Sequence, residues 1–121
     1  MYVGSIKIGT GCLMTKIYIA SPFSHPRLIV RIYRYIKVCR VAGRLIREGN
    51  IVYSPIAHSA PIAWLCRLQG DHATWKEQNR GWISWCDELW VLTIEGWDVS
   101  IGIEWEMEMA RIMGKRVEVF L

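Results

Sequence analysis

The sequence predicts one α/β domain in which a mostly parallel sheet lies between two layers of helices. Its 121 residues are enough for a single domain, and 52% of them are hydrophobic, which is sufficient for a core. Short β-prone segments alternate with longer segments of helical periodicity. Residues 89–94 form a nearly continuous apolar run, which is typical of a central strand covered on both faces. Together these observations favour a three-layer α/β fold.

The first half of the chain divides into strand, helix and strand. Residues 16–20 are β-prone and end at a Ser-Pro pair, which indicates a strand followed by a loop. A helix is predicted over residues 27–48, with Gly49 as its C-cap, and a short strand over residues 51–53. We expect the basic residues of this helix on its outer faces. Its predicted buried stripe is Ile32, Tyr35, Ile36, Cys39, Ala42, Gly43 and Ile46.

The second half adds two strands and further helices. Residues 56–74 contain two histidines, a proline and a glycine, which predict a loop with a short helix before a helix over residues 75–86. After a loop at 96–100, a helix is predicted over 101–113 and a last strand over 115–121. In parallel sheets, ligands bind at the carboxyl ends of the strands. The loops that follow the strands are therefore the expected site.

Composition excludes several classes of protein. The 12% aromatic content and net charge of +4 do not fit a disordered chain. No apolar run reaches the roughly 18–20 residues of a membrane helix. The four cysteines are sparse, with no close pair and no zinc-like spacing, so we expect reduced thiols in a cytoplasmic protein without a metal or cofactor.

The sequence leaves open which ligand the basic charge serves and what residues 1–14 form. The sequence pI of about 9.0 suits an anionic ligand. The basic residues concentrate between residues 27 and 47, where such charges are usually solvated surface, so binding of nucleic acid is the least favoured interpretation. Residues 1–14 do not fit the strand and helix pattern. They are expected to be an N-terminal extension: an extra strand, a flexible arm or an over-called start.

Glu106 is the most informative polar residue. At about 100° per residue it lies about 200° from Glu104, on the same face as Ala110 and Met113, which is the apolar side of the predicted helix. A carboxylate on a packed face is costly unless it is used or paired. Glu106 is therefore either a functional group or a first-turn residue that backbone amides satisfy.

Ser100 and Gly102 precede the body of that helix. This pair suits an anion at a helix N-terminus, because unbonded N–H groups and the helix dipole face it. The alternative is a plain N-cap, and Asp98 could equally be that cap. Trp97, beside a glycine in the same loop, could stack on a base.

Other candidates follow the first two strands. Tyr18 lies near the carboxyl end of the first strand, where tyrosine is also a common β-former. Ser21, Ser24 and His25 come next and could hold a phosphate, although loops rich in Ser and Pro are common. His58 follows the second strand, and a lone histidine is more often structural than functional.

Several segments, taken in order, resemble the nucleoside 2-deoxyribosyltransferase-like superfamily. The resemblance covers about residues 15–121. Within the superfamily, the chain is most similar to a small uncharacterised branch found in bacteria and phages. The segments are Ile17-Tyr18-Ile19-Ala20-Ser21-Pro22-Phe23, Ser54-Pro55-Ile56-Ala57-His58-Ser59, Cys86-Asp87-Glu88-Leu89, and Gly96-Trp97 with Ser100-Ile101-Gly102 and Glu106.

The resemblance implies a flavodoxin-like (Rossmann-like) fold and chemistry at the N-glycosidic bond of a nucleoside or nucleotide. In the family, a glutamate that matches Glu106 attacks the anomeric carbon, and a second base or water resolves the glycosyl-enzyme ester. A tyrosine that matches Tyr18 orients this glutamate. Ser100 stands where the related nucleotide hydrolases have a serine that binds the 5′-phosphate. The resemblance thus favours a 5′-monophosphate substrate, no cofactor, and a homo-oligomer in which a neighbour completes the site.

One departure from the family concerns the proton for the leaving base. The family's aspartate near the sugar is replaced by Asn79, whose amide can bond a hydroxyl but cannot act as a general acid. Activity could be reduced, or Asp71 or Asp87 could substitute, although Asp87 could simply cap a turn. The other alternative is a non-catalytic nucleotide-binding module.

Overall fold

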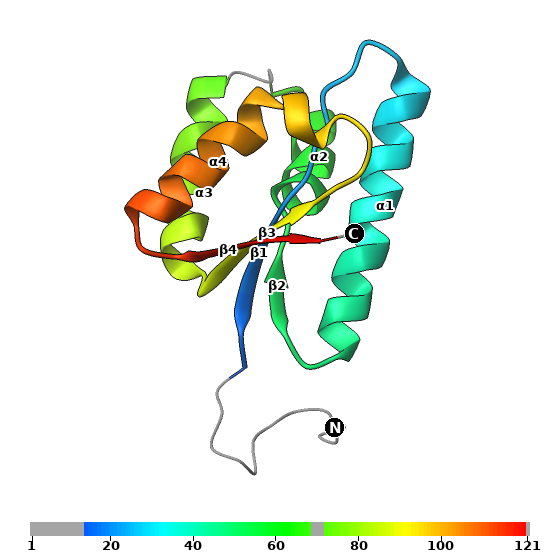
Figure 1. The fold of residues 1–121 in the computed structure, drawn as a ribbon. Helices are drawn as coiled ribbons and strands as arrows, with labels where there is room; N and C mark the ends of the chain where they lie inside the picture. The colour runs from blue at the N-terminus through cyan, green and yellow to red at the C-terminus, as the bar shows by residue number, and fades with distance from the viewer. Residues whose placement is uncertain (1–13, 69–71, 121) are drawn as a thin grey trace.

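The computed structural model describes residues 14–68 and 72–120, which form a sheet with helices on both faces (Figure 1). The sheet has four strands, all parallel, in the order β2-β1-β3-β4. The predicted three-layer α/β fold is therefore confirmed. The strands are β1 (Lys16–Ala20), β2 (Ile51–Tyr53), β3 (Glu88–Leu92) and β4 (Arg116–Phe120).

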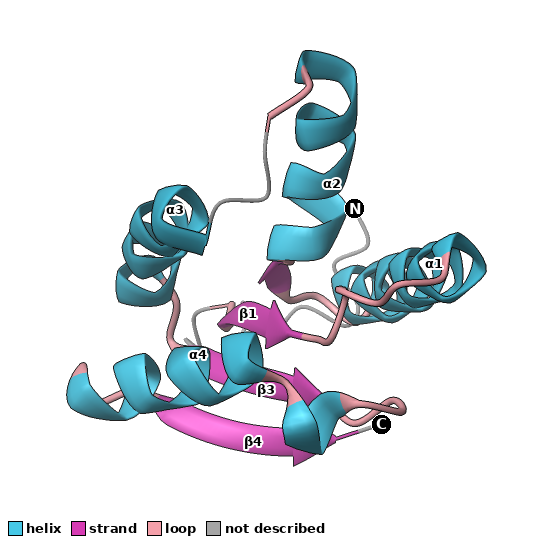
Figure 2. Cartoon of the chain, turned by 90° about the horizontal axis from the view of Figure 1, so that it is seen from above, coloured by secondary structure: helices cyan, strands magenta, loops and turns pink. Residues whose placement is uncertain are grey.

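The helices divide between the two faces of the sheet. Figure 2 shows α1 on one side, α3 and α4 on the other, and α2 beyond the β2 edge. A short 3₁₀ turn, η2, precedes α4. These elements are α1 (Leu28–Arg47), α2 (Pro55–Cys66), α3 (His72–Trp85), η2 (Trp97–Val99) and α4 (Ile101–Ile112). None of the helices in the described ranges is long and apolar enough to cross a membrane.

Alternation along β1 builds a core on each face of the sheet. Ile17 and Ile19 pack with the α1 side, whereas Tyr18 and Ala20 pack with the α3 and α4 side. Successive strand side chains point to opposite faces, so a strand covered on both sides is apolar at every position. All four of these residues are completely buried. β1 is therefore the centre of the molecule, and Tyr18 belongs to the face on which α4 lies.

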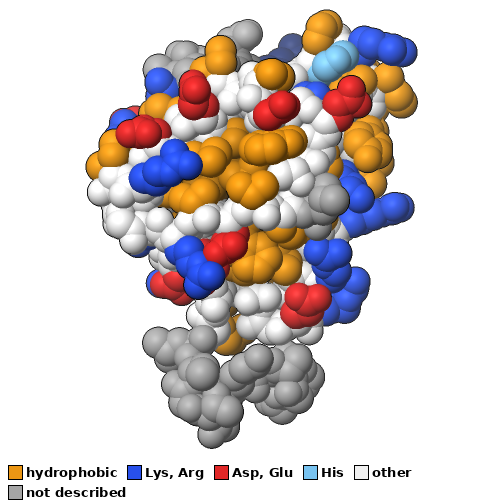
Figure 3. All heavy atoms as spheres, in the orientation of Figure 1, with side chains coloured by type: hydrophobic (Ala, Val, Ile, Leu, Met, Phe, Trp, Pro, Cys, Tyr) orange, Lys and Arg blue, Asp and Glu red, His pale blue; other side chains and the backbone are white. Residues whose placement is uncertain are grey.

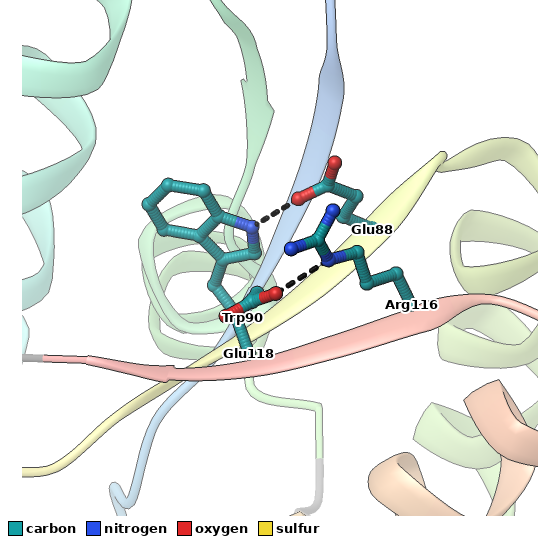
Figure 4. Close-up of polar contacts among 4 residues, drawn as sticks. All are labelled: Glu88, Trp90, Arg116 and Glu118. Carbon is teal, nitrogen blue, oxygen red and sulfur yellow. Dashed lines mark hydrogen bonds and ion pairs between the residues drawn. The ribbon is translucent and has the colours of Figure 1, made fainter.

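The β3–β4 half of the α1 face carries polar contacts (Figure 4). The Trp90 indole Nε1 donates to Glu88 Oε1 over 2.8 Å. Arg116 Nε donates to Glu118 Oε2 over 2.5 Å, on a largely exposed surface. In the strand register Glu88 lies opposite Arg116, and Trp90 lies opposite Glu118. These four side chains are partly buried or exposed, whereas Leu92 further along β3 is completely buried with the α1 side. The start of β3 and β4 is therefore the less covered part of this face.

The predicted buried stripe of α1 is wrong in register. The buried side chains are Arg34, Val38, Val41 and Leu45, whereas Ile32, Ile36 and Ile46 are exposed. Apolar residues occupy more than one face of this helix, so helical spacing alone fits several stripes. The sheet selects the stripe with the compact valines. That stripe includes Arg34, which was expected on an outer face with the other basic residues.

The segment after β2 is also more regular than predicted. In place of a loop with a short helix, α2 is a continuous helix of 12 residues. Ser54 caps it by accepting from the Ala57 amide over 3.1 Å, and Pro55 occupies the first turn, where proline is well tolerated. Pro61 lies inside the helix without ending it. The Ser-Pro pair is therefore a helix start as well as a strand end.

Smaller differences concern the ends of elements. α3 begins at His72 rather than at residue 75, and β3 ends at Leu92, two residues before the end of the apolar run. Of the proposed N-terminal extension, residues 1–13 lie outside the described residues.

Candidate active site

A cavity of about 780 Å³ opens at the carboxyl edge of the sheet. That volume lies within the usual range of small-molecule sites. The loops after β1 and β3 line it, together with residues of α2, α3 and the first turns of α4. The predicted residues that meet there are Ser21, Ser24, His25, Asn79, Ser100, Gly102 and Glu106.

Glu106 lies at the floor of this cavity on the packed face of α4. It is 6% exposed, and Ala110 on the same face is completely buried. Its partner is not a helix amide but the buried Tyr18 hydroxyl, which donates to Glu106 Oε2. The helix periodicity that set Glu106 apart from Glu104 therefore predicted its burial correctly.

The environment of this pair shifts both pKa values upward. Burial raises the pKa of Glu106 to about 8, against the hydrogen bond from Tyr18, which lowers it. Burial, followed by the charge of the Glu106 carboxylate, raises the pKa of Tyr18 well above its usual value. Tyr18 therefore stays a hydrogen-bond donor, and Glu106 changes protonation state within the physiological range. A carboxyl group with such a pKa at a cavity is typical of active sites.

Ser100 acts as the N-cap of α4. Its Oγ accepts from the Ile103 amide over 3.2 Å, and its carbonyl accepts from the Glu104 amide over 3.1 Å. Within the described residues, this leaves the first-turn amides of Ile101 and Gly102 without an acceptor. The cap and the anion site are compatible, because capping uses only part of the amides at this helix end.

In the part of the chain that the structure describes, two polar atoms of cavity-wall side chains are buried without a hydrogen-bond partner. They are the Ser21 hydroxyl and the Asn79 carbonyl Oδ1. Buried polar atoms in folded proteins are nearly always hydrogen bonded. An unpartnered hydroxyl and an unpartnered acceptor that face one cavity are therefore positions at which a ligand can complete the bonding.

Arg34 is a site residue that the sequence reasoning missed. It is 8% exposed, lines the cavity, and donates from Nη1 to Ser24 O over 2.9 Å and from Nη2 to Glu95 O over 3.0 Å. It thereby ties the loop after β1 to the loop after β3. The other basic residues of α1 mask it in the sequence. Only its helical spacing with Val38, Val41 and Leu45 could have indicated that it is buried.

Three other predicted residues, Trp97, Asp98 and His58, do not line the cavity. Trp97 packs against the core on the α4 side, and Asp98 is exposed in η2. His58 is exposed, with its ring 5.4 Å from that of Tyr53. His25 does line the cavity, but its Nδ1 accepts from the Arg27 amide over 3.0 Å. Stacking of a base on Trp97 stays a prediction, since Trp97 itself is not among the residues that line the cavity.

Of the two alternative acids, Asp87 is described by the structure and does not line the cavity. Asp87 precedes β3 at the opposite edge of the sheet, where its Oδ2 accepts from the Lys16 amide over 2.9 Å. The Asp87 amide in turn donates to Lys16 O over 2.8 Å, so this pair joins β1 to the start of β3. Asp71 lies outside the described residues. No group of three or more His, Cys, Asp or Glu side chains in the described ranges could hold a metal ion.

Comparison with known proteins adds a family but no activity. No curated protein matches the chain. A family model described as a domain of unknown function (DUF1937) matches residues 15–121, which are nearly the whole chain. The chain therefore belongs to the DUF1937 family.

Proposed function

We propose that this protein cleaves or transfers the sugar at the N-glycosidic bond of a nucleoside 5′-monophosphate or nucleoside, with Glu106 as nucleophile. The observation that carries the proposal is the buried Glu106 carboxyl, which lines a cavity and receives a hydrogen bond from Tyr18. This pair occupies the positions of the glutamate and tyrosine in the nucleoside 2-deoxyribosyltransferase-like superfamily, which the sequence resembles.

The chemistry requires Glu106 in its ionised form. A carboxylate oxygen attacks the anomeric carbon, and the base leaves with the electron pair of the N-glycosidic bond. Tyr18 holds Oε2, so it fixes the orientation of the carboxylate and stabilises its charge. Water or a second base then attacks the same carbon and releases Glu106. Two displacements retain the configuration of the sugar.

Asn79 has a different role from that of an acid. Its unpartnered Oδ1 can accept a hydrogen bond from a sugar hydroxyl at the cavity wall. It cannot protonate the departing base, so that proton comes from water or from another group. The phosphate of a nucleotide fits the N-terminus of α4 at Ser100 and Gly102, where amides without an acceptor face the cavity.

A second function, nucleotide binding without turnover, is favoured by one observation. Asn79 stands at the cavity where the resemblance calls for an acid. A site of this kind would sense or sequester a nucleotide. We also propose that the protein forms a homo-oligomer, whichever of the two functions it has. The exposed apolar side chains of Trp64 and Leu65 on α2 are surface available for such an interface.

Base release separates the two functions. Purified protein is incubated with ribo- and deoxyribonucleoside 5′-monophosphates and the matching nucleosides, with and without an acceptor base, and free base is followed by chromatography. We expect release by the wild type and a loss of at least about 10³-fold in Glu106→Ala. Glu104→Gln, on the exposed face of the same helix, is the matched control and should keep full activity.

Two outcomes would contradict the enzyme. Equal release by Glu106→Ala would remove Glu106 from the chemistry. Nucleotide binding measured by calorimetry, without release for any substrate, would establish the binding module instead.

A further inference from the structure

We propose that Arg34 supplies the positive charge that makes the cavity select a phosphorylated ligand. In this arrangement a phosphomonoester dianion lies between the Arg34 guanidinium and the N-terminus of α4. The identification of that phosphate as the 5′-phosphate of a nucleotide rests on the proposed function. The anion site itself rests on the geometry of the cavity.

The first step concerns the charge of Arg34. Its two bonds to backbone carbonyls use two of the five N–H donors of the guanidinium. Neither carbonyl carries a formal charge, and no residue of the described chain forms an ion pair with Arg34. A buried charge without a counter-charge is expensive to maintain. An anionic ligand in the adjacent cavity would provide that counter-charge.

The second step concerns where the guanidinium is held. Ser24 O and Glu95 O belong to the loops after β1 and β3, so Arg34 is fixed at the carboxyl edge of the sheet. It lies directly against Gly96, where a Cβ atom would meet Arg34 Nη2 at 2.5 Å. Gly96 lines the same cavity and stands just before η2 and the cap of α4. The guanidinium is therefore packed against the segment that leads into this helix.

The third step is an independent polar atom at the same cavity. Ser21 is 7% exposed, and its hydroxyl has no partner among the described residues. The first-turn amides of Ile101 and Gly102 add donors from another side. A fixed cation, a hydroxyl and a helix N-terminus line one cavity, and these are the kinds of donor that bind a phosphate dianion.

Lys76 is the other cation to be considered in this cavity. It extends from α3 and lies with its Nζ 5.6 Å from the centre of the Trp105 ring. A half-buried lysine over an aromatic ring already has a favourable contact. Among the remaining basic side chains of α1, Arg31 and Lys37 are partly buried and Arg40, Arg44 and Arg47 are exposed. Figure 3 shows Lys and Arg side chains gathered along the α1 side. Arg34 is therefore distinguished by burial rather than by charge alone.

The test compares ligands that differ only in the phosphate. Calorimetry measures the affinities of a nucleoside 5′-monophosphate, its nucleoside and inorganic phosphate for the wild type, Arg34→Gln, Arg34→Lys and Lys76→Gln. We expect Arg34→Gln to lower the affinity for the monophosphate and for inorganic phosphate by about 30-fold or more. The affinity for the nucleoside should stay unchanged. Arg34→Lys should lose less, because it keeps the charge. Arg40→Gln is the matched control on the exposed face of α1.

Several results would overturn the inference. They are an unchanged monophosphate affinity in Arg34→Gln, an equal loss for nucleoside and monophosphate, or a selective loss in Lys76→Gln instead. If Arg34→Gln does not fold, Arg34→Lys and Lys76→Gln decide, because an unchanged monophosphate affinity in Arg34→Lys together with a loss in Lys76→Gln would reject Arg34. In the wild type, inorganic phosphate must compete with the monophosphate and not with the nucleoside, or the anion site itself is rejected. These measurements need no turnover. If binding of the monophosphate depends on Arg34 but no base is released, the enzyme is rejected and the inference about Arg34 stands. If base is released at the same rate in Arg34→Gln, the enzyme stands and the inference is rejected.

Discussion

At the scale of single residues, the Glu106 carboxyl is subject to two opposing influences. Burial raises its pKa, and the hydrogen bond from Tyr18 lowers it, with a result of about 8. Because only the carboxylate can attack carbon, kcat/KM should rise with pH toward about 8. A general acid at this position would instead lose activity above about 8. The direction of the pH profile therefore reports the role of Glu106.

Replacing Tyr18 with phenylalanine removes one of the two influences. The pKa of Glu106 should rise above about 8, because the carboxylate loses the donor that stabilises its charge. At pH 7 we expect kcat/KM to fall about tenfold or more, with the ascending limb moved to higher pH. A pH–rate profile and a direct NMR titration of the Glu106 carboxyl carbon measure this shift.

A control for this substitution is Tyr33→Phe, because Tyr33 is exposed on α1 and does not contact Glu106. An unchanged ascending limb in Tyr18→Phe would show that the hydroxyl does not tune the carboxyl group.

The residue scale also shows what a sequence can and cannot reveal about this site. Glu106 could be predicted because its angular position on the helix coincides with that of Ala110, a relation fixed by the sequence alone. Arg34 was missed because neighbouring residues of its helix carry the same charge, and its spacing with Val38 and Val41 is only one of several stripes that the helix allows. The unpartnered atoms of Ser21 and Asn79 depend on packing between distant segments, which no local pattern encodes.

At the scale of elements, the loop after β3 is held in a conformation that its sequence makes possible. Gly96 has a positive φ of 97°, and a Cβ there would meet Arg34 Nη2 at 2.5 Å. A side chain at this position would suffer backbone strain and would also displace the guanidinium. The glycine therefore serves both the turn and the placement of Arg34.

Gly96→Ala should destabilise the protein by about 2–3 kcal/mol. Gly114→Ala isolates the backbone contribution, since Gly114 has a φ of 74° but nothing within 4 Å of a Cβ, and about 1 kcal/mol is expected. Gly43→Ala, inside α1 with open space around it, should stabilise the protein by about 0.5–1 kcal/mol. Urea denaturation measures all three. Equal effects of Gly96→Ala and Gly114→Ala would show that the contact with Arg34 costs nothing.

Some helices and strands could be predicted from the sequence more accurately than others. The strands and the helix of Glu106 were predicted because their apolar patterns are regular. The helix α2 was not, because Pro61 and the histidines indicate a loop, while the capping bond from Ala57 to Ser54 and the packing against α1 decide otherwise. The register of α1 was missed because its apolar residues cover more than one face, and only the sheet selects between them.

At the scale of the whole molecule, one buried carboxyl links folding stability to pH. The pKa of Glu106 is about 8 in the folded protein and near 4.5 in the unfolded chain. The folded state therefore holds a proton that the unfolded state releases between these values. The corresponding contribution to stability is fully present below about pH 4.5 and is lost as the pH rises to about 8.

Glu106→Gln should remove this dependence. Between pH 5 and pH 8 we expect the wild type to lose about 3–4 kcal/mol of unfolding free energy relative to Glu106→Gln. Urea denaturation at several pH values measures both proteins, and the difference between them cancels the titration of other groups. Parallel curves for the two proteins would contradict a raised pKa of Glu106.

The strand pairing that Asp87 supports and the cavity lie at opposite edges of the sheet. Asp87 and Lys16 join β1 to the start of β3 at the amino edge, whereas the cavity lies among the loops at the carboxyl edge. Each loop enters the cavity from a different strand or helix. A protein engineer could therefore exchange residues 21–26 or 95–100 to change the ligand while leaving the Asp87 pairing intact.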